Sequence, residues 1–279
     1  MAAGTLVPAP LRHDGVMSLR HEPSSDVILD LMRAVADEQI LPRHRRLAEG
    51  DVDQKAPGDY VTIADREAER VLTRELTAMV PGCLVIGEEA CFHDPALERA
   101  AGTAEYAFLV DPVDGTRNFV RGNADFAVMI AEVRSGTAVR SWILQPALGH
   151  AYVAEAGAGA TRDGEPMARR EGSPARPQGV ASQRRLIGFD ADAALAPIIF
   201  GAFAAGIDYP RVATAAVDFV VYKNLHPWDH VPGSLLLRET GGVTRLRDGR
   251  DYRPGDAGPG VIGAGTDAIW LAARRAFQS

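Results

Sequence analysis

The sequence has few cysteines, no long apolar run and no excess of positive charge. Its two cysteines, Cys83 and Cys91, form neither a disulfide framework nor the spacing of a zinc site, so we expect free thiols in a reducing cytoplasm. The longest apolar stretch, 193–207, is shorter than the roughly 18 residues that suggest a membrane span. The N-terminus lacks the basic and apolar segments of a signal peptide. These absences predict a cytoplasmic location and no membrane partner.

The balance of charge is acidic. The 279 residues include 30 Lys+Arg and 37 Asp+Glu, which gives a formal net charge of −7. This balance argues against a nucleic-acid partner, because such proteins usually carry a basic stripe or domain. It does not exclude a phosphorylated ligand, since bound cations can invert the local charge of a site. With 46% hydrophobic residues, the chain can form a large core in one or two domains.

Hydrophobic periodicity and turn residues predict a mixture of helices and strands. Three successive strands form a meander, so the fold is not a plain alternation of parallel strands and helices. We predict a mobile tail at 1–23, a first half at 24–149 and a second half at 150–279. The predicted helices cover 26–47, 65–80, 190–206, 231–241 and the segment after Thr266. The predicted strands cover 60–62, 83–86, 107–110, 126–133, 139–144, 150–154, 243–246 and 260–263, with a hairpin at 157–164, polar loops at 50–58 and 169–177, and either a helix or a strand at 214–221.

Acidic residues gather at the ends of the predicted buried strands. Glu88 and Glu89 follow one strand, Asp111 and Asp114 follow another, and Asp229 precedes a helix. A carboxylate at such a place is costly unless it is paired or binds a metal ion, and too few Lys or Arg residues lie nearby to pair them all. Several carboxylates together with carbonyl groups and waters are the ligands that Mg²⁺ and Mn²⁺ prefer. The pattern therefore predicts a divalent-cation site.

The segment 111–116 carries the densest signal. Pro112 forces a turn after Asp111, which directs Asp114 back toward the same space. Gly115 and Thr116 can offer backbone N–H groups to an anion. Taken alone, the segment could also be an Asp-rich turn that caps a helix.

With these residues in view, the chain resembles the inositol monophosphatase family, within the larger group that includes fructose-1,6-bisphosphatases and 3′-phosphoadenosine 5′-phosphate phosphatases. Three motifs occur in the family's order, and weaker support comes from Lys55 and the segment 58–65. The motifs are Gly87-Glu88-Glu89; Asp111-Pro112-Val113-Asp114-Gly115-Thr116 with Asn118-Phe119; and Trp228-Asp229 with Gly233 and Glu239-Thr240-Gly241-Gly242.

The resemblance implies an α/β protein, α+β in detail, folded as a layered α/β/α/β/α sandwich. It also implies a homodimer, in keeping with the frequency of two-fold oligomers. The implied activity is a Mg²⁺-dependent phosphomonoesterase that acts on a small phosphorylated metabolite by in-line attack of a metal-activated water. Two or three Mg²⁺ ions are implied, with Mn²⁺ as an alternative.

The resemblance also assigns roles to individual residues. The implied metal ligands are Glu88, Asp111, the Val113 carbonyl, Asp114 and Asp229. Asp65, Thr116 and Glu88 would be catalytic, with Thr116 and Asp65 orienting the attacking water. The amides of Gly115 and Thr116 would hold phosphate oxygens. The candidate substrate contacts are Asp114, Asp229, Ala215 and Lys223.

The sequence departs from the family pattern shortly before Trp228. Inositol phosphatases have an acidic residue there that contacts sugar hydroxyls, whereas no carboxylate lies between Tyr222 and Trp228. Lys223 stands where an acid is expected, and Arg117 follows Thr116. We therefore hypothesise a substrate with a second anionic group, the alternative being that both side chains face solvent.

Several nearby residues have two interpretations. Lys55 is either a site residue or a solvated loop lysine, and Glu89 supports the site rather than binding metal. His226 and His230 flank Trp228-Asp229, but imidazole suits softer metals than Mg²⁺. Trp228 is expected in the core.

Other functions stay open at the level of sequence. Fructose-1,6-bisphosphatase, histidinol-phosphate phosphatase and nucleotide 3′-phosphatase activities share the same metal site. A catalytically silent homologue that binds a phosphorylated metabolite is a further alternative. A serine-hydrolase elbow and a Walker A segment are absent.

Overall fold

The computed structural model describes residues 22–277, so all but two residues of the predicted N-terminal tail lie outside the described part. The helices are α1 Ser25–Val35, α2 Ile63–Met79, α3 Glu88–His93, α4 Pro95–Ala100, α5 Thr116–Val120, α6 Ala205–Ala213, α7 Pro227–Glu239 and α8 Asp267–Ala276, with a π-helical turn at Ala36–Ile40 and a 3-10 turn at Arg184–Leu186. The strands are β1 Val52–Ala56, β2 Asp59–Thr62, β3 Leu84–Gly87, β4 Tyr106–Asp114, β5 Ala127–Arg134, β6 Thr137–Gln145, β7 His150–Glu155, β8 Gly159–Arg162, β9 Glu165–Pro166, β10 Gln178–Ala181, β11 Ala196–Phe200, β12 Phe219–Tyr222, β13 Val243–Leu246 and β14 Val261–Ala264.

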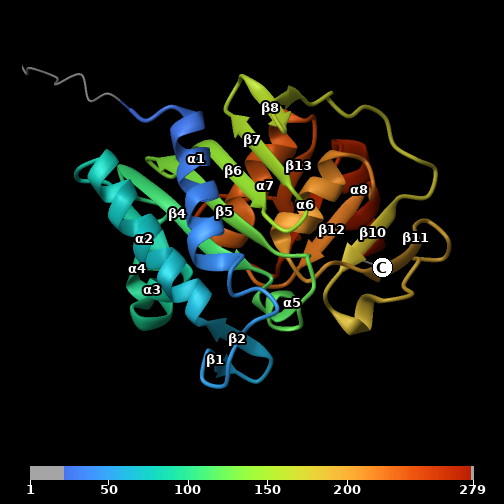
Figure 1. Ribbon diagram of the computed structural model, residues 1–279. Coiled ribbons are helices and arrows are strands. Elements are labelled where there is room, and N and C mark those ends of the chain that lie inside the picture. The colour runs from blue at the N-terminus through green and yellow to red at the C-terminus, as the bar shows by residue number, and fades with distance from the viewer. Residues whose placement is uncertain (1–21, 278–279) are drawn as a thin grey trace, which may run out of the picture.

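Two large sheets and three helical layers stack on one another. The seven-stranded sheet runs in the order β3-β4-β5-β6-β7-β8-β9, and the five-stranded sheet in the order β11-β10-β12-β14-β13. Figure 1 shows α1 and α2 outside the larger sheet, α6 and α7 between the two sheets, and α8 outside the smaller sheet. The predicted α/β/α/β/α sandwich is therefore confirmed.

Strand β5 shows how the sequence builds these layers. Successive side chains of a strand point to opposite faces of a sheet. Val128 and Ile130 pack into the core beneath α1 and α2, whereas Ala127 and Met129 pack into the core shared with α6 and α7. Residues 127–133 are all buried, because helices cover both faces of this strand.

Most predicted elements are present, with shifts at their ends. The meander is confirmed as β5, β6 and β7, and Thr266 caps the last helix as expected. The first helix is shorter than predicted, because regular α-helix ends at Val35 and a π-helical turn follows. The loop predicted at 50–58 contains β1, which forms a hairpin with β2. The segment 214–221, for which the sequence left helix and strand as alternatives, contains the first three residues of strand β12.

The helix predicted over 190–206 is wrong. Turns occupy 191–194, β11 follows as an edge strand of the smaller sheet, and α6 begins only at Ala205. An apolar stretch without clear periodicity fits a buried strand as well as a helix. Pro197 lies inside β11, where an edge strand tolerates a residue that cannot donate a ladder hydrogen bond.

The division proposed near Gly149 falls inside the larger sheet. Strand β7 begins at His150 and pairs with β6 along its whole length. The chain changes sheets only between Pro166 at the end of β9 and Gln178 at the start of β10. Within residues 22–277, no helix combines the length and apolar character needed to cross a bilayer.

Candidate active site

The segment 111–116 forms an irregular end to strand β4. Sequence analysis placed the end of this strand before Asp111, but β4 continues to Asp114, and its register with β5 shifts between Asp111 and Asp114. Such bulges redirect side chains and are frequent beside active sites. Asp111 is 2% exposed and Asp114 is 7% exposed, so two carboxylates lie together in the interior.

Gly115 connects β4 to the short helix α5. Its φ of +84° is a left-handed conformation that glycine adopts without strain. A Cβ here would also lie 2.8 Å from Ala204 Cβ and 2.9 Å from the Asp125 carbonyl oxygen. The glycine of this motif is therefore required by both its backbone angle and its surroundings.

Thr116 and Asp65 are brought together from positions 51 residues apart. The Thr116 hydroxyl lies 3.1 Å from Asp65 Oδ1 and 3.0 Å from the Val113 carbonyl oxygen. Asp65 Oδ2 accepts a hydrogen bond of 2.8 Å from the Thr62 amide and a second from the Thr62 hydroxyl. These bonds complete a capping box at the start of α2, which begins at Ile63 rather than at Asp65. Burial, with the negative charge of Glu88, raises the pKa of Asp65 to about 7.

Glu88 and Glu89 begin helix α3, and both pair with the ammonium group of Lys55. Lys55 Nζ lies 2.9 Å from Glu88 Oε1 and 2.6 Å from Glu89 Oε1, and its side chain is 6% exposed. Burial lowers the pKa of Lys55, but the two carboxylates outweigh it and raise this pKa above its ordinary value. Of the two interpretations of Lys55, the structure supports the site residue.

Glu69 is a site-supporting residue that sequence reasoning missed. Its carboxylate accepts hydrogen bonds of 2.8 Å from the amides of Glu89 and Ala90, and so caps helix α3. Burial raises the pKa of Glu69 to about 7. A signal was available in the sequence, because Glu69 follows Asp65 by four residues and therefore shares its face of α2.

Gly87 is required because Glu69 fills the space beside it. A Cβ on Gly87 would lie 2.2 Å from the Glu69 carboxyl carbon. We expect Gly87→Ala to displace Glu69, remove the cap of α3 and lower the free energy of unfolding by about 1–3 kcal/mol. Thermal unfolding measures this loss. Gly258→Ala is the control, since Gly258, like Gly87, lacks a positive φ, and its added Cβ would meet nothing closer than Leu246 Cδ1 at 3.4 Å. A loss no larger than the control's would contradict the steric argument.

Asp114 faces the start of helix α6. Its carboxylate accepts hydrogen bonds of 3.1 Å from the Ala205 amide and 2.6 Å from the Gly206 amide. The structure does not bring Ala215, the proposed substrate contact, to this place. Ala215 lies beyond the end of α6, exposed, and lines a separate hollow with Arg169 and Arg170. The segment 204–206 meets the site instead.

Asp229 joins the site from the second half of the chain. It lies in the first turn of α7, which starts at Pro227. Loss of hydration, followed by the charges of Asp114 and Glu88, raises the pKa of Asp229 well above its ordinary range. Desolvation and the neighbouring carboxylates, Glu88 first, do the same to Asp111. Within residues 22–277, no Lys, Arg or His forms an ion pair with Asp111, Asp114 or Asp229.

This donor set fits a hard cation, although its side chains do not yet enclose one. The oxygens come from carboxylates, the Val113 carbonyl and the Thr116 hydroxyl, which suit Mg²⁺ or Mn²⁺. In the described chain, no three Asp, Glu, His or Cys side chains converge closely enough to hold an ion. Glu88 is turned toward Lys55 and Asp114 toward the amides of α6. Mutual repulsion of uncompensated carboxylates accounts for these alternative partners.

Two cavities open beside the carboxylates, and Asp229 lines both. The first, of about 610 Å³, is lined by Lys55, Glu88 and Trp228 among others. The second, of about 340 Å³, is lined by Asp114 and Lys223 among others. Lys223 therefore lies next to the site, and its side chain is exposed. Arg117 is exposed as well and lies over the Phe203 ring, with 5.4 Å between its Cζ and the ring centroid.

The two histidines have other partners, in keeping with the sequence interpretation. Both ring nitrogens of His230 are engaged, at 3.2 Å from the Tyr209 hydroxyl and 2.9 Å from the Asn224 carbonyl oxygen. Burial lowers the pKa of His230 to about 3. His226 lies 2.9 Å from Glu98 Oε1 and stacks on Trp228, which is 5% exposed and belongs to the core.

The architecture and the site together define an α/β/α/β/α sandwich with a cluster of uncompensated carboxylates at the end of β4 and the start of α7. The inositol monophosphatase family model matches residues 24–276. The chain belongs to the inositol monophosphatase family, and its membership points to phosphatase activity. Members of this family are typically dependent on metal ions.

Individual relatives agree with this membership. The inositol-1-monophosphatase of Rhizobium meliloti is 32% identical over 244 residues, covering 81% of this chain and 86% of the relative. The Nus factor SuhB of Pseudomonas aeruginosa is 30% identical over 240 residues, covering 80% and 84%. The solved structure of the Thermotoga maritima IMPase superposes with a TM-score of 0.75 at 25% identity, covering 91% of this chain and 97% of that one.

Proposed function

We propose that this protein is a Mg²⁺-dependent phosphomonoesterase that hydrolyses a small phosphorylated metabolite. The observation that carries the proposal is the burial of Asp111, Asp114 and Asp229 near one another without a cationic partner, beside the hydroxyl of Thr116 and the carboxylate of Asp65. A cluster of charges that raise one another's pKa values in a cleft is typical of a functional site. The inositol-1-monophosphatase among its relatives supports the same reaction class.

Five residues would hold the ions in this proposal. They are Glu88, Asp111, Val113 through its carbonyl, Asp114 and Asp229. When bound, divalent cations lower the pKa of a water molecule and neutralise charge on the phosphoryl oxygens. Glu88 and Asp114 would have to exchange Lys55 and the α6 amides for the cation.

The chain's own groups position the reactants. The Thr116 hydroxyl, held by Asp65 and the Val113 carbonyl, is placed to orient an attacking water. The amides of Gly115 and Thr116, ahead of the first turn of α5, would hold phosphate oxygens. Burial raises the pKa of Asp65 to about 7, so near neutral pH this carboxylate can accept a proton from the water by way of the Thr116 hydroxyl. In-line phosphoryl transfer needs little more than this positioning and charge neutralisation.

The proposed substrate carries a second anionic group besides the phosphate that is cleaved. Lys223 is exposed at the cavity lined by Asp114 and Asp229, and its ammonium group has no partner within the described residues. Tyr222, the neighbouring residue, donates a hydrogen bond of 3.1 Å to Asp208 Oδ2 and thereby occupies that carboxylate. Because the ammonium group of Lys223 has no paired carboxylate, we expect the site to bind a bisphosphate or a phosphorylated acid in preference to a neutral sugar ester.

Release of inorganic phosphate from a panel of esters tests both parts of the proposal. We expect turnover that requires Mg²⁺, is abolished by chelation, and is faster for doubly anionic esters than for polyol monophosphates. Lys223→Gln should reduce that preference about fivefold to tenfold with little change in turnover of neutral esters, since one charge-assisted contact is lost. Lys223→Arg serves as the matched control. Equal turnover of both ester classes would overturn the substrate assignment alone, and a panel without Mg²⁺-dependent turnover would overturn the phosphatase.

The remaining sequence predictions belong to this proposal as well. A cytoplasmic location is supported by the two free cysteines, of which Cys91 is buried. A homodimer rests on the resemblance and on the frequency of two-fold oligomers. The relatives called Nus factor SuhB keep a second kind of role open for members of the family. For this chain, the retained Asp65, Thr116 and carboxylate set favours an active enzyme over a silent homologue.

A further inference from the structure

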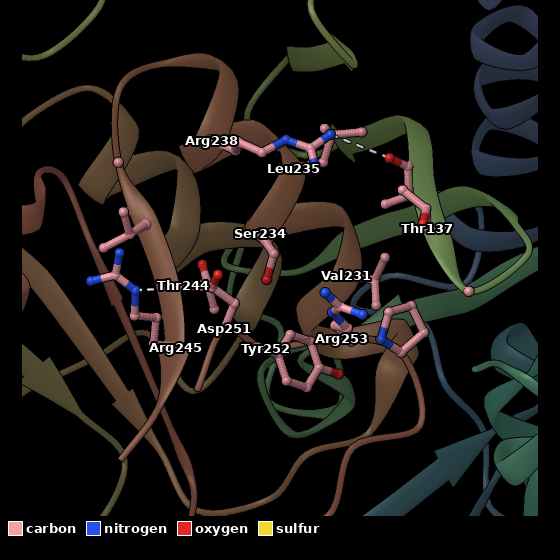
Figure 2. A pocket seen from close by; sticks show the side chains of 15 residues that line it. Thr137, Val231, Ser234, Leu235, Arg238, Thr244, Arg245, Asp251, Tyr252 and Arg253 are labelled. Carbon is pink, nitrogen blue, oxygen red and sulfur yellow. Dashed lines mark hydrogen bonds and ion pairs between the residues drawn. The ribbon is translucent and has the colours of Figure 1, made fainter. Parts of the chain in front are cut away.

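A further cavity, separate from the two beside the carboxylates, is lined by the side of helix α7 that carries Val231, Ser234 and Arg238. It has a volume of about 450 Å³, which is within the usual range of small-molecule sites. Its walls are the turn between β5 and β6, one side of α7, strand β13 and the segment 251–254. Figure 2 shows Ser234 near its centre, with Arg238 and Arg253 on opposite sides. It shares no lining residue with either cavity of the candidate active site.

The lining of this cavity is cationic, although the whole chain is acidic. Three arginines, Arg238, Arg245 and Arg253, face a single carboxylate, Asp251. Asp251 is engaged already, because Arg245 Nε donates to its Oδ1 over 2.8 Å. Arg245 also pairs with Asp267 outside the cavity. Arg238 pairs over 3.3 Å with Glu239, which does not line the cavity, and Arg253 has no paired carboxylate within residues 22–277.

These two guanidinium groups retain unused hydrogen-bond donors. The Arg253 guanidinium has no hydrogen bond or ion pair within residues 22–277. Among the described residues, Arg238 donates only two hydrogen bonds, both of 3.3 Å, to Glu239 Oε1 and to the Ala138 carbonyl oxygen. A guanidinium has five N–H donors in a planar fork that matches phosphate and carboxylate oxygens.

A buried hydroxyl adds to the donors. Thr244 lines the cavity, and its Oγ1 is buried and has no hydrogen-bond partner in the described structure. A rotation of this side chain about its Cα–Cβ bond would turn the hydroxyl toward the cavity. A buried hydroxyl without a partner costs free energy, so such groups usually indicate a missing partner. An oxyanion inside the cavity would supply one.

We propose that this cavity is a second ligand site, which binds a small phosphorylated metabolite through Arg238, Arg253 and the hydroxyl of Thr244. The site does not depend on the phosphatase proposal, since none of its residues touches the carboxylate cluster. It has a direct mechanical link to that cluster, because α7 carries Asp229 in its first turn and Arg238 in its last turn.

Binding of inorganic phosphate to the full chain, freed of divalent cations on a chelating resin, tests the proposal. Without cations the carboxylate cluster repels anions, so the measured binding reports the cavity lined by Arg238 and Arg253. Isothermal titration at low ionic strength should give one phosphate per chain. Arg238→Gln combined with Arg253→Gln should weaken binding at least tenfold. Thr244→Val, which keeps the shape of the side chain, should weaken binding severalfold without lowering the thermal unfolding temperature.

The control variant removes the same amount of positive charge at positions away from the cavity. Arg46→Gln combined with Arg275→Gln removes two exposed arginines that do not line it, and should leave phosphate binding unchanged. Equal weakening in the two double variants would overturn the site, because only the overall charge would then matter. Saturable binding of succinate without binding of phosphate would overturn the assignment of a phosphate ester.

Discussion

Replacing Asp111 by asparagine should lower kcat/KM for phosphate-ester hydrolysis by at least about a thousandfold, which corresponds to about 4 kcal/mol of transition-state stabilisation. Asp111 is the carboxylate on which the others converge, since Glu88, Asp114, Asp229 and Asp65 all raise its pKa. Asparagine has nearly the same shape but no negative charge. Steady-state kinetics with Mg²⁺ in excess measure the loss.

The fold should survive this substitution. Asp111 Oδ1 accepts a hydrogen bond of 3.1 Å from the Val113 amide, and the asparagine carbonyl can accept the same bond. Removing one uncompensated charge should even raise the unfolding temperature of the metal-free protein. Asp37→Asn, the same change at an exposed site, should leave kcat/KM unchanged. Activity of Asp111→Asn within tenfold of the original would show that this carboxylate is not needed for the reaction.

The parts of the site that follow from local chemistry could be predicted from the sequence. Asp111, Asp114 and Thr116 lie within six residues, so a single turn decides how their side chains group. The meander 127–155 was predictable for a similar reason, because its strands are sequential neighbours joined by short turns.

The parts that depend on contacts between distant segments could not be predicted. The cap that Glu69 provides to α3 requires α2 to lie beside β3 and the start of α3. The spacing of Asp65 and Glu69 indicates a shared face of α2, but it does not indicate what that face packs against. The meeting of Asp114 with the amides of Ala205 and Gly206 joins segments 91 and 92 residues apart. Ala215, which the resemblance offered as a substrate contact, lies beyond the other end of the same helix.

The resulting site is balanced between two arrangements of the same carboxylates. Without a cation, Glu88 pairs with Lys55, and Asp114 accepts from the amides of α6. Asp111 and Asp229 have no cationic partner, and burial together with neighbouring carboxylates, Glu88 among them, raises the pKa of each. Protonation and cation binding are therefore two ways to relieve the same repulsion, and they should compete.

The stability of the metal-free protein should consequently fall as the pH rises from 6.5 to 8. Burial raises the pKa values of Asp65 and Asp114 to about 7 from an ordinary value of 3.8. Over this range the native state still releases protons that the unfolded chain lost at lower pH. The native state binds more protons, so the free energy of unfolding decreases with pH until these groups are ionised. The window starts at 6.5 because His230, whose pKa burial lowers to about 3, gives the opposite slope below its ordinary value of 6.5.

Mg²⁺ should remove most of this pH dependence, because it neutralises the same carboxylates. A single group whose pKa moves from 3.8 to about 7 corresponds to about 4 kcal/mol in total, most of it already lost by pH 6.5. Saturating Mg²⁺ at a hundred times its Kd adds about 2.7 kcal/mol, or an increase of about 5–10 °C in Tm for a chain of this size. Differential scanning fluorimetry at pH 6.5, 7.2 and 8, with Mg²⁺ or with chelator, measures both effects. We expect the gain from Mg²⁺ to be largest at pH 8, and Asp111→Asn to reduce that gain at every pH. A gain that is the same at pH 6.5 and pH 8, or a metal-free Tm that rises over this range, would show that the carboxylates do not share one site for protons and cations.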